Sequence, residues 1–395
     1  MTAAHPIENA WLSTGGTGAQ NYDEYADESR ITEIVAAKPT SMLAVEMPDR
    51  TPEAVAAGMS FTDCLPAAAE RLEALQQTGR FARAGQVVVA YRISGEDRCA
   101  YGLFCMVDTD EISTSAEEPG RVIRNEDVFI EKVRQRAALN AQLRHLLSPV
   151  LLVQHGKSEE LQAALADACV GEPAVTDVDE AGRRHEIWPV APGPKQDLLC
   201  ELAGGGDLIV ADGNHRSLAA QVGELPRFLA VVTTPESVTI QPYHRLLVSA
   251  PLTGEALLDA LRERGAEVTA VPGPLSTPDG VVHLYLNETV YAVRLPAVEG
   301  SIVERLDHAR VESVLFNDIL GMDAGDKRIT YVGGDYPPSW LAEQVDSGSA
   351  VAAILIAAVT VEDFISVNLA RLKLPRKSTW FTPKARAGLV LADLR

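Results

Sequence analysis

The alternation of apolar and polar residues predicts a chain built from short strands and amphipathic helices. Apolar runs of strand length occur at residues 86–92, 101–108, 149–154, 208–211 and 227–233. Between them, apolar residues recur three or four positions apart, the spacing of one helix face, most clearly at 128–143 and 158–170. We therefore expect a mixed α/β (α+β) fold.

The same patterning suggests where the chain divides. Residues 1–20 show no periodicity and are predicted to be a loose arm, whereas residues 41–47 are predicted to be a strand. The pattern of apolar and polar residues changes after Ser249-Ala250-Pro251. A chain of 395 residues is long enough for two hydrophobic cores. We expect one domain over 1–250 and a smaller α/β domain over 251–395.

One stretch combines a strand, a sharp turn and a helix. Apolar residues 208–211 lead into Asp212-Gly213, and a helical pattern follows from Ser217. The unpaired N–H groups and the dipole at such a helix start favour an anion, typically a phosphate. Gly213 permits close backbone approach, and His215 and Arg216 add donors. The alternative is a plain turn in which Asp212 or Asn214 caps the helix and His215-Arg216 is solvated.

A second stretch places charged residues before a long amphipathic helix. Arg124-Asn125-Glu126-Asp127 precedes a helix that carries Lys132 and Arg136 on one face. One interpretation makes Glu126 a general base and the three cations a phosphate clamp. The other makes Glu126 a carboxylate favoured by the helix dipole, beside a solvated Lys/Arg stripe.

Two more polar segments are candidates for anion binding. Pro242-Tyr243-His244-Arg245 interrupts an apolar strand, and its His244 and Arg245 could reach a shared anion or form an exposed bulge. Residues 373–384 form the one compact basic cluster of the chain, including Lys377 and Lys384. This cluster could fold over a phosphate or be a plain charged tail.

Composition and charge narrow the functional classes. With 35 basic and 55 acidic residues the formal net charge is −20, which repels nucleic acid and anionic membranes. The five cysteines are widely spaced without a C-x-x-C pair, which argues against a disulfide framework or a zinc cage. The longest apolar stretch, 350–359, is too short for a bilayer. We expect a soluble, cytoplasmic protein that binds neither nucleic acid nor membrane.

Several motifs together resemble a large bacterial family of uncharacterised domains, whose signature is Ala-Asp-Gly-His-His-Arg. The matching segments follow the family's order and cover nearly the whole chain: Tyr22-Asp23, Arg124-Asn125-Glu126, Ala211-Asp212-Gly213-Asn214-His215-Arg216, Pro242-Tyr243-His244-Arg245 and Pro375-Arg376-Lys377-Ser378-Thr379. The chain departs from the family's pattern in carrying Asn125 and Asn214 where histidine is usual, and Gln135 where an aspartate usually precedes the arginine.

The Asp-Gly-x-His-Arg loop is in turn similar to the phosphate loop of the ParB/sulfiredoxin superfamily, which includes free-serine kinases. This resemblance implies a ParB/sulfiredoxin-like nucleotide-binding core. Sulfiredoxin needs a cysteine in the loop, where this chain has Asn214, and ParB needs a basic DNA-binding module, which the sequence lacks. The resemblance therefore favours a kinase.

From these observations we expect a small-molecule kinase that transfers a phosphoryl group from ATP (or ADP or pyrophosphate) to a free hydroxy amino acid such as L-serine. Asp212 would hold Mg²⁺, Glu126 and His215 would act with it in catalysis, and phosphates or the substrate carboxylate would be bound by Gly213, Asn214, His215, Arg216, Arg124, Arg136, Arg245 and Lys377. The alternatives are a non-catalytic nucleotide-binding regulator and a phosphate-ester hydrolase. The oligomeric state is open, a homodimer included.

Overall fold

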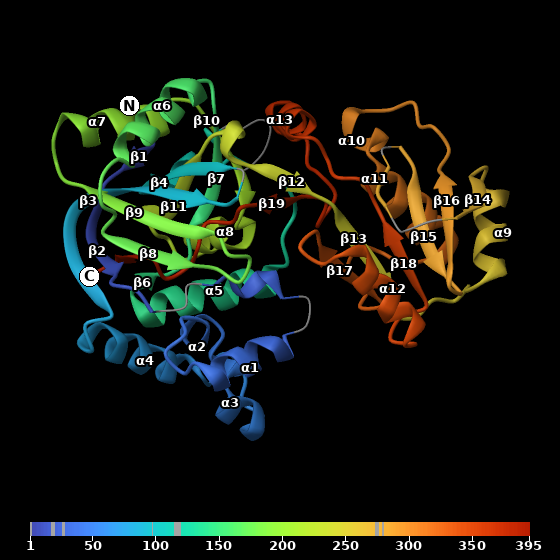
Figure 1. The fold of residues 1–395 in the computed structure, drawn as a ribbon, viewed down its shortest axis with the longest axis horizontal. Coiled ribbons are helices and arrows are strands. Elements are labelled where there is room, and N and C mark those ends of the chain that lie inside the picture. The colour runs from blue at the N-terminus through green and yellow to red at the C-terminus, as the bar shows by residue number, and fades with distance from the viewer. Residues whose placement is uncertain are drawn as a thin grey trace. The chain divides into compact units, whose positions relative to one another are not determined.

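The computed structural model describes residues 2–16, 20–25, 28–96, 98–113, 120–272, 276–278 and 280–395, with only the main chain of Asp23. The chain forms two compact units (Figure 1). The first comprises Met1–Thr239 and Pro383–Arg395, and the second comprises Ile240–Thr382. This division differs from the expected one after residue 250, because the chain crosses into the second unit earlier and its last segment returns to the first.

A large mixed sheet forms the centre of the first unit. Its strand order is β5-β10-β7-β11-β4-β3-β2-β20-β6, with β1 added on β4, β9 on β3 and β8 on β9. The strands are β1 (Ala4–His5), β2 (Ile7–Ser13), β3 (Phe81–Ser94), β4 (Cys99–Asp108), β5 (Val122–Arg124), β6 (His145–Leu146), β7 (Val150–His155), β8 (Val175–Val178), β9 (Arg184–Val190), β10 (Asp207–Asp212), β11 (Arg227–Thr233) and β20 (Val390–Asp393).

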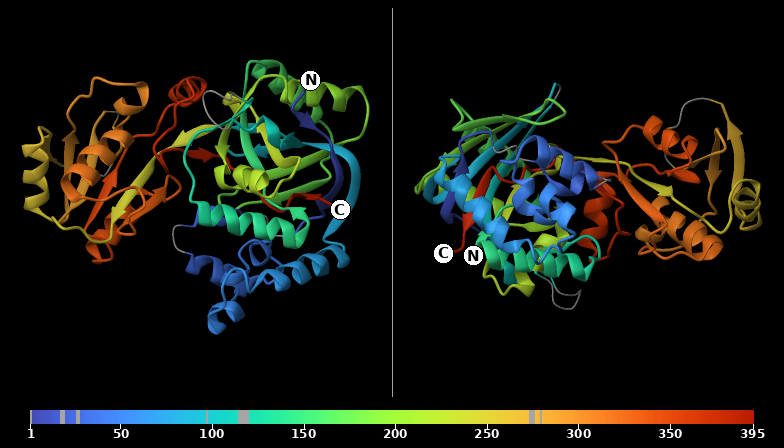
Figure 2. Two further views of the ribbon diagram at one scale, coloured as in Figure 1. Left: turned by 180° about the vertical axis from the view of Figure 1, so that it is seen from behind. Right: turned by 90° about the horizontal axis from the view of Figure 1, so that it is seen from below.

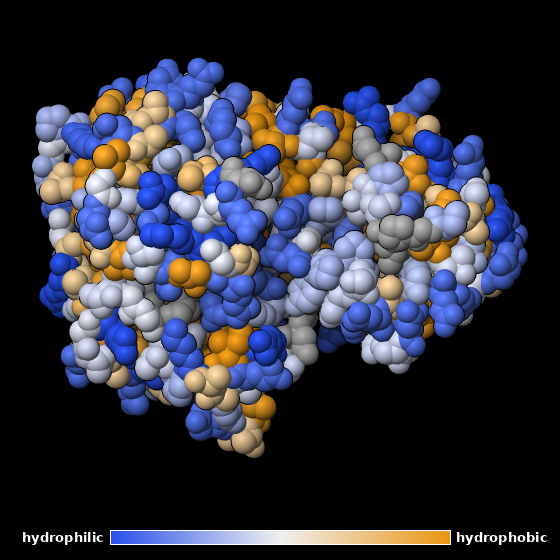
Figure 3. All heavy atoms as spheres, viewed as in Figure 1, coloured by the Kyte–Doolittle hydropathy of each residue, from blue (hydrophilic) through white to orange (hydrophobic). Residues whose placement is uncertain are grey.

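Helices cover both faces of this sheet, as the two orientations in Figure 2 show. They are α1 (Ser29–Ala37), α2 (Leu43–Glu46), α3 (Pro52–Ala57), α4 (Leu65–Gln77), α5 (Ile130–Leu143), α6 (Ser158–Ala168), α7 (Pro194–Ala203) and α8 (Asn214–Val222). Leu161 of α6 and Leu199 of α7 pack on alternate residues of β7 and β10, whereas Leu72 of α4 and Leu139 of α5 belong to a separate core. The face drawn in Figure 3 is mostly hydrophilic, in keeping with the burial of these apolar side chains.

Two expectations about the N-terminal region were wrong. The predicted loose arm contains β1 and β2, and β2 pairs with the distant strands β3 and β20. The predicted strand at 41–47 contains α2, whose four residues are all buried. Short apolar runs do not distinguish a buried strand from a buried helix, and pairing with remote segments leaves no local signal.

The second unit is built on an antiparallel sheet of order β14-β16-β15-β18-β13-β17. The strands of this sheet are β13 (Tyr243–Leu247), β14 (Glu267–Val271), β15 (Val282–Leu286), β16 (Thr289–Arg294), β17 (Ile329–Gly333) and β18 (Ala352–Leu355). Strands β12 (Thr239–Gln241) and β19 (Trp380–Thr382) pair with each other in a separate two-stranded sheet. The helices of the second unit are α9 (Glu255–Glu263), α10 (Ile302–Arg305), α11 (Asp307–Arg310), α12 (Pro338–Asp346) and α13 (Val361–Leu369), with a π-helix at Val311–Leu320. The mixed α/β class is thus confirmed in both units.

The returning C-terminal segment is tied into the first unit by a buried ion network. Strand β20 inserts between β2 and β6, and the Arg386 side chain is only 6% exposed. Its guanidinium donates to Glu24 Oε2 at 2.7 Å and to Asp179 Oδ2 at 3.0 Å. Burial would raise the pKa of Asp179, yet hydrogen bonds from His185, Arg183 and Arg386 hold that pKa well below its usual range.

We predict that Arg386→Met lowers the free energy of unfolding by about 3–5 kcal/mol, because it leaves Glu24 and Asp179 buried without this cation. Lys195→Met, also in the first unit, removes a pair with Asp167 in which both side chains are about half or more exposed, and should cost about 1 kcal/mol or less. Urea denaturation of both variants measures the difference. Equal losses of unfolding free energy in the two variants would show that the Arg386 network contributes no more stability than a surface ion pair.

Candidate functional site

Two loops meet at one edge of the first unit's sheet because their strands are parallel neighbours. Strand β5 pairs with β10 in the register Val210↔Arg124, so both chains leave the sheet at the same edge. The segment that follows β5 leads to α5, and the segment that follows β10 leads to α8. The carboxyl ends of such strands are the usual location of ligand sites in α/β sheets.

The turn after β10 has the predicted strand–turn–helix geometry. Gly213 has φ +94° and ψ 29°, in the left-handed region, and α8 begins at the next residue. A Cβ at Gly213 would lie 3.2 Å from the Cα of Val150 and 3.0 Å from Nε of Arg216. Glycine is therefore required both by the backbone conformation and by the close approach of β7.

Direct contacts hold the two loops together. Asn214 Nδ2 donates to Asn125 Oδ1 at 2.5 Å, and the Phe129 N–H donates to His215 Nε2 at 3.1 Å while the two rings stack. Because Nε2 accepts this bond, the neutral imidazole carries its proton on Nδ1. Glu126 lies in the sequence between these anchors, so the predicted general base belongs to the segment held against the loop. Asn125 and Asn214 thus form a contacting pair that joins the two loops.

Asp212 is engaged by two cations. Its Oδ2 accepts a hydrogen bond from Arg216 Nη2, and Lys384 Nζ lies 3.6 Å from its Oδ1. Arg216 also donates to the Pro149 carbonyl at 2.5 Å. Lys384 comes from the predicted basic tail, and it is buried. The described residues contain no cluster of three or more His, Cys, Asp or Glu arranged for a metal ion.

Arg124 supplies a cation at the end of β5. Its side chain is partly buried, and burial lowers the pKa of its guanidinium. Its Nε is buried and makes no hydrogen bond to any part of the chain that the structure describes. A partly desolvated cation with an unused donor is a favourable partner for an anion.

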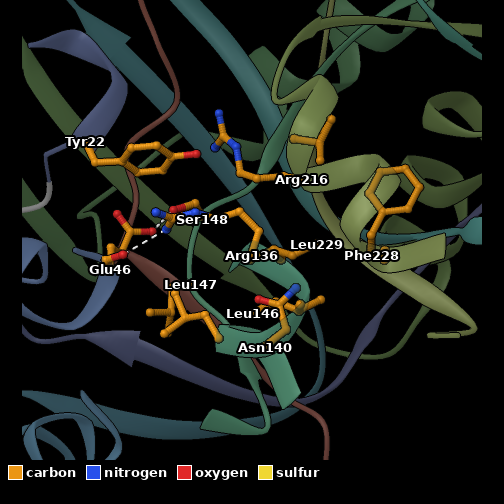
Figure 4. A pocket seen from close by; sticks show the side chains of 13 residues that line it. Tyr22, Glu46, Arg136, Asn140, Leu146, Leu147, Ser148, Arg216, Phe228 and Leu229 are labelled. Atoms are coloured by element: carbon orange, nitrogen blue, oxygen red, sulfur yellow. Dashed lines mark hydrogen bonds between the residues drawn. The ribbon is translucent and has the colours of Figure 1, made fainter. Parts of the chain in front are cut away.

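A small cavity with both polar and apolar lining residues lies beside the loop (Figure 4). Its volume is about 30 Å³, and its polar lining residues are Tyr22, Glu46, Arg136, Asn140, Ser148 and Arg216. In Figure 4, Glu46, Ser148 and Arg136 lie close together, with Tyr22 and Arg216 above them. Arg216 therefore belongs both to the loop and to the cavity.

Arg136 is predicted as a ligand-binding cation, and the structure fixes it in the wall of this cavity. It is 8% exposed and donates to the Glu46 carbonyl at 2.8 Å and to Met47 Sδ at 2.9 Å. Its guanidinium lies 4.2 Å from the Tyr22 ring centroid and 5.2 Å from that of Phe61. Lys132, expected on the same helix face, is exposed instead.

Sequence reasoning missed Glu46 and Ser148. The Ser148 hydroxyl donates to Glu46 Oε1, and the Glu46 side chain is almost fully buried. The only available signal was a single acidic residue inside the apolar run 41–47. A carboxylate in such a run is costly unless it is partnered, so it marked a buried polar site.

Arg245 and Lys377 lie in the second unit, not in the unit that carries the loop. Arg245 is completely buried in β13, where it donates to the carbonyls of Tyr243 and Arg376 and stacks 4.4 Å from the Tyr331 ring centroid. Lys377 Nζ lies 5.6 Å from the Tyr243 ring centroid. The expected alternative of an exposed bulge at Arg245 is therefore wrong, whereas a role of Arg245 and Lys377 in ligand binding stays a prediction.

Comparisons with known proteins identify a family but no activity. Residues 17–309 match the model of a family described as "Protein of unknown function (DUF1015)". No curated protein matches the chain significantly. No helix among the described residues is long and apolar enough to cross a membrane.

Solved structures with some similarity share little sequence with the chain. A free serine kinase in complex with AMP is 13% identical with a TM-score of 0.39, covering 72% of this chain and 92% of that chain. A conserved hypothetical protein from Pyrococcus furiosus is 13% identical with a TM-score of 0.38, covering 72% and 95%. SbnI with a C-terminal truncation, from Staphylococcus aureus, is 10% identical with a TM-score of 0.36, covering 72% and 87%.

We predict that Gly213→Ala is more destabilising than Gly171→Ala. Both glycines have positive φ, +94° and +86°, so each alanine incurs backbone strain of about 1–2 kcal/mol. A Cβ at Gly171 meets no atom within 4 Å, whereas one at Gly213 is crowded by Val150 and Arg216. Urea unfolding should show about 1 kcal/mol more loss for Gly213→Ala. Matching losses would contradict close packing of the loop on β7.

We also predict a pH-dependent contribution from His244 in the second unit. Burial, followed by the charge of Arg245, lowers the pKa of His244 from 6.5 to about 4, and its Nδ1 accepts the Ile356 N–H at 3.3 Å. The unfolded state binds this proton first, so stability is lost as pH falls from 6.5 towards 4. Between pH 7 and 5 wild type should lose about 2 kcal/mol more than His244→Asn in urea unfolding. Parallel pH profiles would show that folding does not lower the pKa of His244.

Proposed function

The chain belongs to the family described as protein of unknown function (DUF1015), and because that description names no activity, we propose its function from the site. The protein is a small-molecule kinase. It transfers a phosphoryl group from ATP, or from ADP or pyrophosphate, to the hydroxyl of a free amino acid such as L-serine, giving O-phosphoserine.

The observation that carries the proposal is the junction of the two loops at the ends of β5 and β10. The start of α8 offers N–H groups and a dipole suited to phosphate, with Gly213 allowing close approach. Arg216 follows on the first turn of α8, and Arg124 stands at the end of the neighbouring strand. Gly213, Asn214, His215, Arg216 and Arg124 would hold the phosphates of the donor.

The acceptor would bind beside this loop, in the cavity that Arg216 shares with it. Its hydroxyl oxygen attacks the terminal phosphorus, the bond from phosphorus to the bridging oxygen breaks, and Glu126 takes the hydroxyl proton. His215, oriented by the Phe129 N–H, would donate through Nδ1 to a phosphate oxygen. Arg136 would bind the substrate carboxylate. Phosphoryl transfer depends on such positioning and charge neutralisation.

Mg²⁺, when bound, would neutralise charge on the transferring phosphates. Magnesium is commonly held by one or two carboxylates together with substrate phosphates. Asp212 is the carboxylate at the turn, but Arg216 and Lys384 already neutralise it. Asp212 can therefore fit a metal ion only if a ligand draws these cations away, and no step of the proposal depends on that exchange.

The ion pairs of Asp212 with Arg216 and Lys384 favour a second candidate function. A carboxylate that is already paired with two cations suits a loop that binds nucleotide without catalysis. In that case the protein would be a nucleotide-binding regulator, with the loop as a switch for a partner protein.

Phosphorus NMR on the purified protein tests the proposal. With Mg²⁺, ATP or pyrophosphate, and a panel of hydroxy amino acids, we expect a new phosphomonoester signal. Glu126→Ala and His215→Ala should each reduce its rate of formation by about 100-fold or more, through loss of the base and of an oriented donor. Glu131→Ala, an exposed position on the first turn of α5, is the matched control and should keep wild-type turnover.

Nucleotide binding by calorimetry on the same samples separates the candidates. A protein that binds nucleotide but forms no phosphomonoester with any donor is the regulator and not a kinase. Release of inorganic phosphate without an amino acid would instead indicate a hydrolase.

A further inference from the structure

We propose a second ligand site in the first unit, a groove that binds a small organic anion in which a flat ring carries a carboxylate or phosphate group. The groove consists of two adjoining hollows of about 520 and 550 Å³, which share Trp11, Arg83 and Arg395 as lining residues. It is called the Trp11 groove below. The site goes beyond the proposed function and does not depend on it.

The Trp11 groove is separate from the candidate functional site. One hollow is lined from β2, β3 and the C-terminal segment, and the other also from α4 and the end of α5. Arg144, which follows the last residue of α5, lines the groove, whereas the loop contacts Phe129 just before the first residue of α5. A helix of 14 residues is about 20 Å long, so a ligand in the groove is remote from the phosphate loop.

Arg83 is an exposed cation that lies over an aromatic ring. Strands β2 and β3 pair in the register Trp11↔Arg83, and the Arg83 guanidinium is 4.5 Å from the Trp11 ring centroid. The indole is itself fixed, because its Nε1–H donates to Asp393 Oδ2 at 3.3 Å. The Arg83 guanidinium forms no hydrogen bond or ion pair within the described part of the chain. Its N–H donors are therefore available to a ligand.

Arg144 is a second cation, and its backbone is strained. Its φ of 53° and ψ of 33° lie in the left-handed region. This conformation costs a residue with a side chain about 1–2 kcal/mol, a cost that glycine avoids at the end of a helix. The helix dipole favours a cation here, yet the exposed side chain pairs with no carboxylate that the structure describes. An anion bound in the groove would be the partner of this strained arginine.

The balance of charge in the Trp11 groove favours an anion. Among the described residues, its lining holds three guanidinium groups, of Arg83, Arg144 and Arg395, against two side-chain carboxylates, of Glu73 and Asp393. Asp393 is already engaged, since Arg395 donates to both of its oxygens at 2.8 Å. The formal net charge of the whole chain is −20, so a local excess of cations provides a distinct position for an anionic ligand.

The size and surface of the groove favour a ring next to the charged group. A volume of several hundred Å³ is typical of a small-molecule site. The partly exposed Trp11 indole offers an aromatic surface, and Ala84 and Gly85 beside it carry little or no side chain. A flat ring can therefore lie along Trp11 and Arg83, while its carboxylate or phosphate accepts hydrogen bonds from Arg83 and Arg144.

NMR of the tryptophan indole N–H groups tests this site directly. The chain has four tryptophans, and Trp11→Phe identifies the signal of Trp11. Titration of the full chain with phthalate or phenyl phosphate should shift this signal, and the tighter of the two probes shows whether the site prefers carboxylate or phosphate. Succinate and inorganic phosphate, which lack the ring, should bind about fivefold more weakly or worse.

Arg83→Gln combined with Arg144→Gln removes both guanidinium groups and should weaken binding of the tighter probe about tenfold or more. Arg134→Gln combined with Arg305→Gln changes the net charge equally at two exposed positions outside the groove, and should leave the affinity unchanged. Equal weakening in the two double variants, or a Trp11 signal that no probe shifts, would overturn the proposal. Equal affinity for probes with and without the ring would overturn the assignment of a ring-bearing ligand.

Discussion

Parallel strands that are neighbours in a sheet have their carboxyl ends at the same edge, and the candidate site depends on this constraint. The register of β5 on β10 brings Asn125 to Asn214 and Phe129 to His215, although almost ninety residues separate the members of each pair. The left-handed turn at Gly213 then directs α8 so that Arg216 returns over Asp212 and Pro149. A shift of this pairing by one residue would separate Asn125 from Asn214 and Phe129 from His215.

A chain of strong acidic excess nevertheless buries several arginines, and each is stabilised in a different way. Arg386 is enclosed by two carboxylates and Arg245 by backbone carbonyls, so both are largely satisfied by the protein itself. Arg136 is held by a carbonyl, a sulfur atom and two aromatic faces. It also lines the cavity beside the loop, where we propose that it binds an anionic group of a ligand.

The C-terminal segment is part of the first unit and not an appended tail. Strand β20 extends the large sheet, Arg386 joins the N-terminal segment at Glu24, and Lys384 pairs with Asp212. Asn21 adds two hydrogen bonds with the main chain of Ala385 and Ala387. The C-terminal residues therefore supply both a strand of the first unit's sheet and a cation at its loop.

The sequence by itself determined the local parts of this protein: the strand, turn and helix at residues 207–222, the long helix at 130–143, and the mixed α/β class. These elements follow from the spacing of apolar residues and from a glycine at a turn. Both are local features of the sequence, so neighbouring residues are enough to specify them. The tertiary structure alone decided that β2 and β20 join one sheet, that residues 43–46 are helical, and that Glu46 and Lys384 lie near Arg136 and Asp212 respectively. Those relations depend on burial and on pairing between segments remote in sequence, so no local pattern of residues can specify them.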